Sequence, residues 1–209
     1  PQKIVYIKGN TKKNILKQIN KISQKAISVF KANEIKEKQK RIKNSILKTK
    51  ELDSIGISLT MSSGYKLFKK ESNNKFWFQR ETQKGSVNLL IYTLPLYKES
   101  PNLESIIALR DSIGKAFVPG RNKDSYLITE KAYEPYFFNT KVSSLNAFET
   151  RGTWEVINDY MAGPFLNYYI KDTKNNRTLV IEGFVFSPSV RKREYLVELE
   201  AIVRSLKVF

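Results

Sequence analysis

Three segments in the last third of the chain decide its fold: AFETRGTWEV at residues 147–156, FLNYYIK at 165–171 and RTLVIEGFVF at 177–186. The first alternates strictly between apolar and polar residues, which is the period of a β-strand with one buried face. A turn sequence, DTKNN at 172–176, joins the second segment to the third. The three segments therefore predict neighbouring antiparallel strands.

Further strands are expected upstream of this group. After Gly56 apolar residues recur at every second position, and this period predicts strands at 57–62, 65–68, 76–80 and 87–93. Ser100-Pro101 then suggests the cap and first residue of a helix that ends before Pro119. A last helix is predicted from about Ser187 or Ser189, with apolar residues at helical steps to Leu206 and an exposed Glu200–Arg204 pair.

The first 55 residues differ in character from the rest. Lys3 to Ile7 is strand-like, and Thr11 is a plausible helix cap. Apolar residues from Ile15 to Phe30 recur at three- and four-residue steps, with lysines between them, and a weaker stripe extends the helical pattern to about Leu52. We expect residues 1–55 to be a basic strand–helix segment that belongs to a larger upstream unit.

The fold class that follows is α+β. Strands in hairpin order with helices between and after them predict an antiparallel sheet covered by helices, in a two- or three-layer sandwich. This sheet domain is expected to span residues 56–209. The chain opens at Pro1 without a methionine, which we interpret as the start of a fragment or of a processed product.

The charge is concentrated in the first segment. Lys plus Arg number 37 and Asp plus Glu 20, so the net charge is +17. Residues 1–60 hold 15 basic and 4 acidic side chains, a net of +11, whereas the remaining residues have a net of +6. A basic surface attracts anionic partners through a field that salt screens over about 10 Å.

The chain contains no histidine and no cysteine, which removes most enzyme mechanisms and the usual zinc ligands. No phosphate-binding glycine loop occurs either. We therefore expect no cofactor and no metal site, and name no catalytic residue. A hydrolase that uses carboxylates, acting on envelope glycan, remains an alternative, although Glu149 and Glu155 on one strand face would lie about 20 Å apart.

Several motifs carry a resemblance to a known family: ETRGTW at 149–154, MAGPF at 161–165, EGFVF at 182–186 and KREYL at 192–196. Together they resemble an uncharacterised bacterial envelope lipoprotein family, catalogued as domain of unknown function 4837. The resemblance implies a parent protein with a lipid anchor in the periplasm, and no assigned activity. The order of elements is also similar to the PsbP-like sandwich, by analogy of fold only.

Glu182 and Arg151 are the first candidate binding residues. Glu182 shares a strand face with Val180 and Phe184, an apolar setting in which a carboxylate needs a partner. We expect Arg151 to be that partner, because a guanidinium binds a carboxylate through two hydrogen bonds. The pair is interpreted first as structural and second as part of a ligand site.

Aromatic side chains supply the other candidates. Trp154 lies close to the loop at 158–164, which contains Tyr160, and such rings stack on a ligand or pack in a core. Trp77 stands between two phenylalanines, so an outward ring there would mark a contact surface.

The sequence predicts a non-enzymatic envelope protein that binds through its sheet and loops. The expected partner is a protein or an anionic envelope component, and contact with membrane is expected only through the parent's lipid anchor. A non-specific nucleic-acid binder is a further alternative, although no recognition motif is present and the basic segment 12–50 contains one aromatic residue, Phe30.

Overall fold

The computed structural model describes residues 3–72 and 74–209. The strands are β1 (Ile57–Ser58), β2 (Lys66–Glu71), β3 (Lys75–Thr82), β4 (Gly85–Pro95), β5 (Leu127–Thr129), β6 (Tyr136–Val142), β7 (Leu145–Val156), β8 (Ala162–Asp172), β9 (Arg177–Phe186) and β10 (Lys207–Val208). The helices are α1 (Lys12–Ile42), the short 3-10 helix η1 (Glu51–Ile55), α2 (Leu103–Phe117) and α3 (Arg193–Val203).

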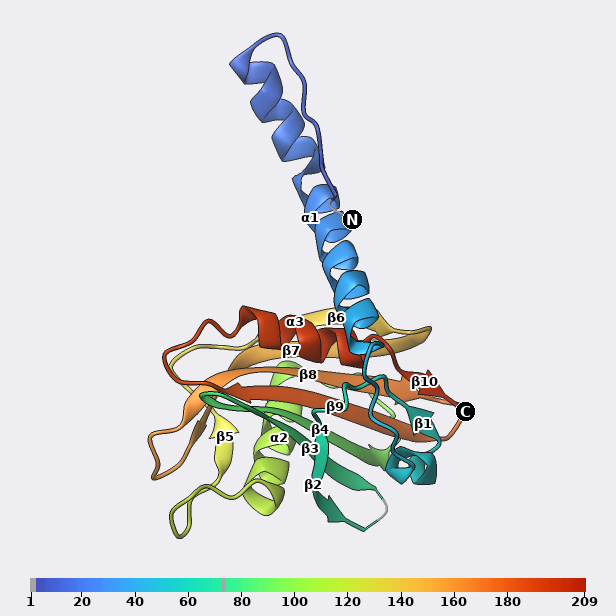
Figure 1. Ribbon diagram of the computed structural model, residues 1–209, viewed down its shortest axis with the longest axis vertical. Helices are drawn as coiled ribbons and strands as arrows, with labels where there is room; N and C mark the ends of the chain where they lie inside the picture. The colour runs from blue at the N-terminus through green and yellow to red at the C-terminus, as the bar shows by residue number, and fades with distance from the viewer. Residues whose placement is uncertain (1–2, 73) are drawn as a thin grey trace.

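A single antiparallel sheet forms the centre of the molecule (Figure 1). Its strands lie in the order β2-β3-β4-β9-β8-β7-β5, and β6 pairs with the first half of β7 while β5 pairs with its end. β1 and β10 form a separate two-stranded pair. The predicted antiparallel sheet, and the antiparallel order of residues 147–186 within it, are confirmed.

Helices cover both faces of the sheet, so the sandwich has three layers. α3 packs on one face, over a core that includes Leu89, Ile181 and Leu199. α2 packs on the other face, where Phe117 contacts Trp77 in a core that also contains Trp154 and Phe184. Because successive strand residues point to opposite faces, β9 supplies both cores and is buried on both sides.

α1 leaves the sandwich and projects away from it (Figure 1). The Thr11 hydroxyl caps the helix by accepting a hydrogen bond from the Asn14 amide at 3.2 Å, as predicted. At the other end Ile42 is buried in the α3-side core and Ile35 packs against it. Residues 3–10 run back beside the helix, and we call residues 3–30 the arm.

The predicted strand at Lys3–Ile7 is wrong. Residues 3–9 are not assigned to a strand, and no backbone hydrogen bond joins them to another described residue. A strand requires a neighbour, and the sequence pattern supplied none.

The helical pattern also ends earlier than predicted. α1 stops at Ile42 instead of about Leu52, and the latter belongs to η1, where it is buried with Ile55 in the same core as the sheet. At α2 the N-cap is Asn102, two residues beyond the predicted Ser100, and its side chain accepts from the Ser105 amide. No described helix is long and apolar enough to cross a membrane.

Candidate functional site

The predicted pairing of Arg151 with Glu182 is wrong, and the register of the sheet explains why. Arg151 lies opposite Leu166, which lies opposite Gly183, so these three residues share the α3 face. Glu182 is the neighbour of Gly183 and therefore points to the α2 face. Trp154 of β7 and Phe184 of β9 lie on the α2 face together with Glu182. The polar face of β7, which carries Arg151, is therefore turned away from Glu182.

The partner of Glu182 is Arg110 of α2. The two side chains are 1–2% exposed, and their nearest nitrogen and oxygen lie 2.8 Å apart. Asn167 donates a hydrogen bond to the other oxygen of the Glu182 carboxylate at 3.0 Å, and the guanidinium of Arg110 lies 3.9 Å from the centre of the Phe165 ring. Sequence reasoning missed Arg110, although it stands on the apolar stripe of the predicted helix, which was the signal for a buried charge facing the sheet.

Both tryptophans lie in the α2-side core and not on the surface. Trp77 faces away from Phe76 and Phe78, as alternation requires, but α2 covers it and it is 6% exposed. Trp154 is 1% exposed and packs edge-on against Phe184. The outward ring expected at Trp77 is therefore not available for contact.

Of the predicted binding residues, Tyr160 is the one that is fully exposed. It follows Asp159, whose carboxylate binds the guanidinium of Arg121 and lies outside both cores. Nothing brings Tyr160 together with Arg151 or Glu182.

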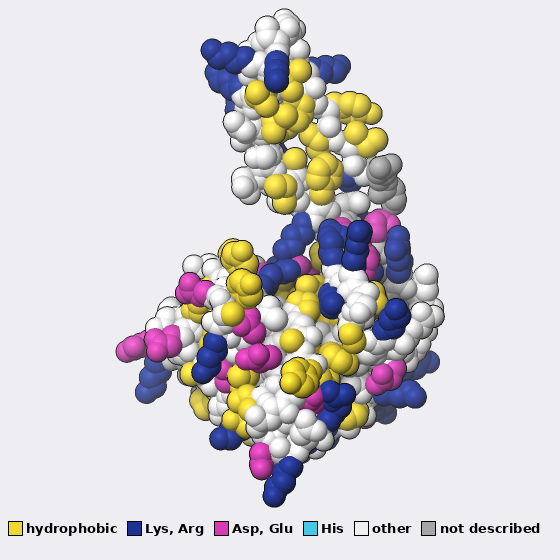
Figure 2. Space-filling view, turned by 90° about the vertical axis from the view of Figure 1, so that its left-hand side faces the viewer, with side chains coloured by type: hydrophobic (Ala, Val, Ile, Leu, Met, Phe, Trp, Pro, Cys, Tyr) yellow, Lys and Arg dark blue, Asp and Glu magenta, His cyan; other side chains and the backbone are white. Residues whose placement is uncertain are grey.

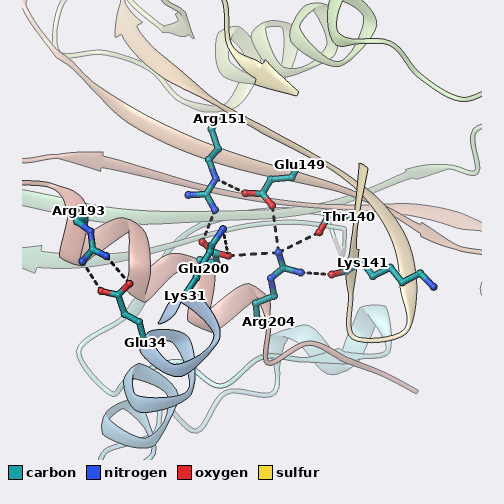
Figure 3. A network of polar contacts seen from close by, with 9 residues as sticks. All are labelled: Lys31, Glu34, Thr140, Lys141, Glu149, Arg151, Arg193, Glu200 and Arg204. Carbon is teal, nitrogen blue, oxygen red and sulfur yellow. Dashed lines mark hydrogen bonds and ion pairs between the residues drawn. The ribbon is translucent and has the colours of Figure 1, made fainter. Parts of the chain in front are cut away.

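Arg151 is instead the centre of an ionic cluster beneath α3 (Figure 3). Its Nε donates to Glu149 of the same strand, and its Nη2 donates to Glu200 of α3 at 2.5 Å. Lys31 of α1 approaches Glu200 at 3.1 Å, and Arg204 lies 3.4 Å from Glu149 and 3.7 Å from Glu200. We call these five residues the junction network, because they join α1 and α3 to the sheet.

The two acids of the network are buried, and each forms ion pairs with cations of the network. Glu149 is 5% and Glu200 3% exposed. The predicted pairing of Glu200 with Arg204 is confirmed at 3.7 Å, but the prediction that the pair is exposed is wrong. Burial by itself raises the pKa of Glu200, but Arg151 and Lys31 outweigh it and hold the pKa below its usual value. Burial lowers the pKa of Arg151, yet Glu149 and Glu200 raise it overall.

Two more ion pairs fasten α1 to α3. Arg193 forms two hydrogen bonds with Glu34, at 2.6 and 2.7 Å, and Lys38 lies 3.2 Å from Glu194 (Figure 3 shows the first pair). These pairs are exposed, so each contributes at most about 1 kcal/mol. Together with the buried network they fix the direction in which the arm projects.

A cleft of about 330 Å³ opens next to the junction network, between α1 and α3. Arg151 of β7 lines the cleft together with apolar side chains from both helices: Ile27, Phe30 and Ile35 of α1, and Leu196 and Val197 of α3. Arg151 is thus the one predicted binding residue that lines this cleft.

Two carboxylates of the junction network share one cation. Glu149 and Glu200 both accept hydrogen bonds from the guanidinium of Arg151. The pKa of Glu200 is lowered. Among the described residues no group of three or more acids is placed to hold a metal ion.

The arm carries the largest concentration of exposed apolar side chains. Sixteen large hydrophobic residues are exposed in the described part of the chain, and eight of them belong to the arm: Ile4, Val5, Tyr6, Leu16, Ile19, Ile27, Val29 and Phe30. Residues 3–31 contain eight lysines and no acidic residue. Figure 2 shows apolar side chains gathered on one face of the arm, with basic side chains around its tip.

The spacing of the residues explains this division. Positions 15, 19, 22 and 26 fall on one side of the helix, and the lysines at 13, 17, 21 and 25 fall on the opposite side. Gly9 lies against Ile15, and Ile15, Ile22 and Ala26 are half-buried. The rest of the apolar side faces solvent.

Comparison with known proteins gives a family but no activity. Residues 1–43 match the family model Domain of unknown function (DUF8532). No curated protein matches the chain. Solved structures with similar folds include a point mutant of the protein Mog1 (9% identity, TM-score 0.45) and the Saccharomyces cerevisiae Ran-binding protein Mog1p (10% identity, TM-score 0.43). In each case the match covers 73% of this chain and 90% of the other. The family model Domain of unknown function (DUF4837) matches residues 41–205, so the chain belongs to that family.

Proposed function

We propose that this protein is a non-enzymatic binding protein and that the arm is its contact surface. One observation carries the proposal: half of the exposed large hydrophobic side chains of the described residues lie in the arm, in a stretch whose only charged side chains are lysines. Such a concentration of apolar surface beside charge is typical of interaction sites. The expected sheet-and-loop face offers less, because Trp77, Trp154 and Glu182 are buried.

The attachment of the arm supports this function. Residues 31–42 of α1 are held by ion pairs to α3 and by Ile42 in the core, while residues 12–30 project from the sandwich (Figure 1). A contact surface that is already fixed in direction loses less conformational entropy on binding than a flexible tail.

The partner and the location are part of the same proposal. We propose that the partner is a protein or an anionic component of the bacterial envelope, because the seven lysines of the arm, a segment without an acidic residue, attract negative charge. The family resemblance suggests a lipid-anchored parent in the periplasm. Fractionation of cells that carry the native protein tests this location, and recovery with the cytosol would contradict it.

The test of the arm uses two variants that lose the same charge. In the first, four arm lysines are replaced by glutamine: Lys13, Lys17, Lys21 and Lys25. In the second, four exposed lysines of the sandwich are replaced: Lys84, Lys123, Lys131 and Lys174. Each labelled chain is titrated with an isolated envelope fraction at low and at physiological salt.

The arm variant should bind about tenfold more weakly than the parent, and the sandwich variant should bind within about twofold of it, because the arm lysines lie on the same helix as the contact, within about one helix diameter of 10–12 Å. Raising the salt should weaken the binding of the parent more than that of the arm variant. Equal losses in both variants would show that net charge, and not the arm, governs binding.

A further inference from the structure

We infer that the corner between the arm and the sandwich receives an acidic, amphipathic helix of a partner protein. The inference rests on the proposed function and names the chemistry of its partner. It follows from the shape of the corner, from the apolar residues of its two walls and from the sign of the charge beside them.

The first wall is a helical stripe on the arm. Leu16, Ile19, Ile27 and Phe30 follow one side of α1 at helical spacing and are 39–58% exposed. Ile27 and Phe30 also line the cleft at the base of the arm, so the stripe leads into it. Ridges of this kind pack against another helix at an interaxial distance of about 8–10 Å.

The second wall lies on the α3 side of the sandwich. Leu196 and Val197 of α3 line the cleft together with Arg151 of β7, the strand that pairs with β6. Tyr136 is the cross-strand partner of Arg151, and its ring stacks on that of Phe138 at a centroid distance of 6.2 Å. Both rings are exposed, so the apolar surface continues from the cleft onto β6.

The shape of this surface fits a single helix better than a flat membrane. Figure 1 shows the sandwich extending beyond the arm on the side from which Figure 2 is viewed, and Figure 2 shows the apolar face of the arm on that side, with a hollow where it meets the sandwich. A flat lipid bilayer that followed the stripe would collide with the sandwich. A single helix, about 10–12 Å across, fits along the arm and against α3.

Charge complementarity selects an acidic helix. Lys12 and Lys13 are the i,i+4 and i,i+3 neighbours of Leu16 in the stripe, and residues 3–30 contain no acidic residue, so glutamates flanking the apolar face of a bound helix would be attracted to this end of the arm. A second copy of this chain fits less well, because two arms would bring lysines against lysines.

The test uses a synthetic peptide of about twenty residues, which as a helix matches the roughly 30 Å of the projecting part of α1. Its apolar residues recur at helical steps, and glutamates flank them; a second peptide carries lysines in place of the glutamates. Binding of each labelled peptide to the full chain is measured by fluorescence anisotropy. In parallel, the chain is sedimented with phosphatidylcholine vesicles and with vesicles that contain one third phosphatidylglycerol, and its oligomeric state is measured by ultracentrifugation.

The glutamate peptide should bind at least about tenfold more tightly than the lysine peptide. The double variant Ile27→Asp, Phe30→Asp should lower that affinity about tenfold or more, since both side chains are exposed and the fold does not depend on them. The matched control is Tyr160→Asp, at a fully exposed aromatic outside the corner, which should change it less than about twofold.

Equal affinity for the two peptides, or an unchanged affinity in the double variant, would overturn the inference. So would binding to the anionic vesicles without binding to the glutamate peptide, or a dimer that the double variant abolishes. In those cases the loss of envelope binding in the arm-lysine variant would still stand, so failure of this inference is separable from failure of the proposed function.

Discussion

The buried pair between Arg110 and Glu182 makes the sharpest prediction about stability. Replacing Glu182 by leucine leaves the guanidinium of Arg110 with its charge in the α2-side core, without its carboxylate partner. Breaking a buried pair in this way costs about 3–5 kcal/mol. The opposite change, Arg110→Met, leaves the carboxylate with one hydrogen bond, from Asn167.

The surroundings of Arg110 place the cost of Glu182→Leu at the lower end of that range. The guanidinium keeps a hydrogen bond to the Thr129 hydroxyl at 2.8 Å, a contact with Asp111 at 3.4 Å and the face of the Phe165 ring. We therefore expect about 3 kcal/mol, which in a protein of this size lowers the melting temperature by roughly 6–12 °C. The double variant Arg110→Met, Glu182→Leu should recover most of this loss, because two apolar side chains of similar volume need no partner.

Urea unfolding followed by tryptophan fluorescence provides the assay, since Trp77 and Trp154 both lie in the α2-side core. The four proteins of the double-mutant cycle are compared at one pH and one salt concentration. A single variant that loses less than about 1 kcal/mol, or a double variant whose loss equals the sum of the two singles, would refute the argument that the pair is buried and mutually dependent.

Three further predictions concern other parts of the structure. The folded-state pKa of Glu200 is lowered, so its pairing with Arg151 and Lys31 stabilises the fold above the unfolded-state pKa near 4.5, and this stabilisation is lost as the pH falls through the folded value. Between pH 6 and about pH 3, the unfolding free energy of Glu200→Gln should therefore fall less than that of the parent in matched urea titrations. Parallel curves for the two proteins would contradict this. Gly163→Ala should destabilise the protein by about 2 kcal/mol or more, because an added Cβ would overlap the carbonyl oxygen of Val185. A thermal unfolding curve that matches that of the parent would contradict this, because it would mean that β8 moves to make room for the Cβ at little cost. Tyr160→Ala should change the unfolding free energy by less than about 0.5 kcal/mol, since the side chain is fully exposed, and a larger change would reveal a contact that the structure does not contain.

The strands with a long alternating pattern were predictable from the sequence. β7 alternates over ten positions and β9 is an almost continuous apolar run, and the structure reproduces the antiparallel order of β7, β8 and β9 and the turn between β8 and β9. β6 was not predicted, since its seven residues place three aromatics at one end and few apolar residues after them. Residues 3–7 have the composition of a strand but no neighbour with which to pair, which composition alone does not reveal.

The pairing of charges was less predictable than the strands. Glu182 was identified as a buried acid, and its burial is confirmed, but its partner depends on which face of β7 meets which face of β9. A shift of one residue exchanges the two faces, so the choice between Arg151 and Arg110 required the three-dimensional register. Glu200 was expected at the surface because Arg204 follows it by one turn, whereas it points to the sheet.

The continuity of α1 has a mechanical consequence. Its 31 residues form one unbroken helix, of which 31–42 are clamped to α3 and 12–30 are not. A force on the tip is therefore transmitted as a torque about the clamp, over a free lever of roughly 28 Å against a held length of roughly 18 Å at 1.5 Å per residue. Tension at the tip of the arm would load the Lys31–Glu200 and Arg193–Glu34 contacts before it reached the sheet.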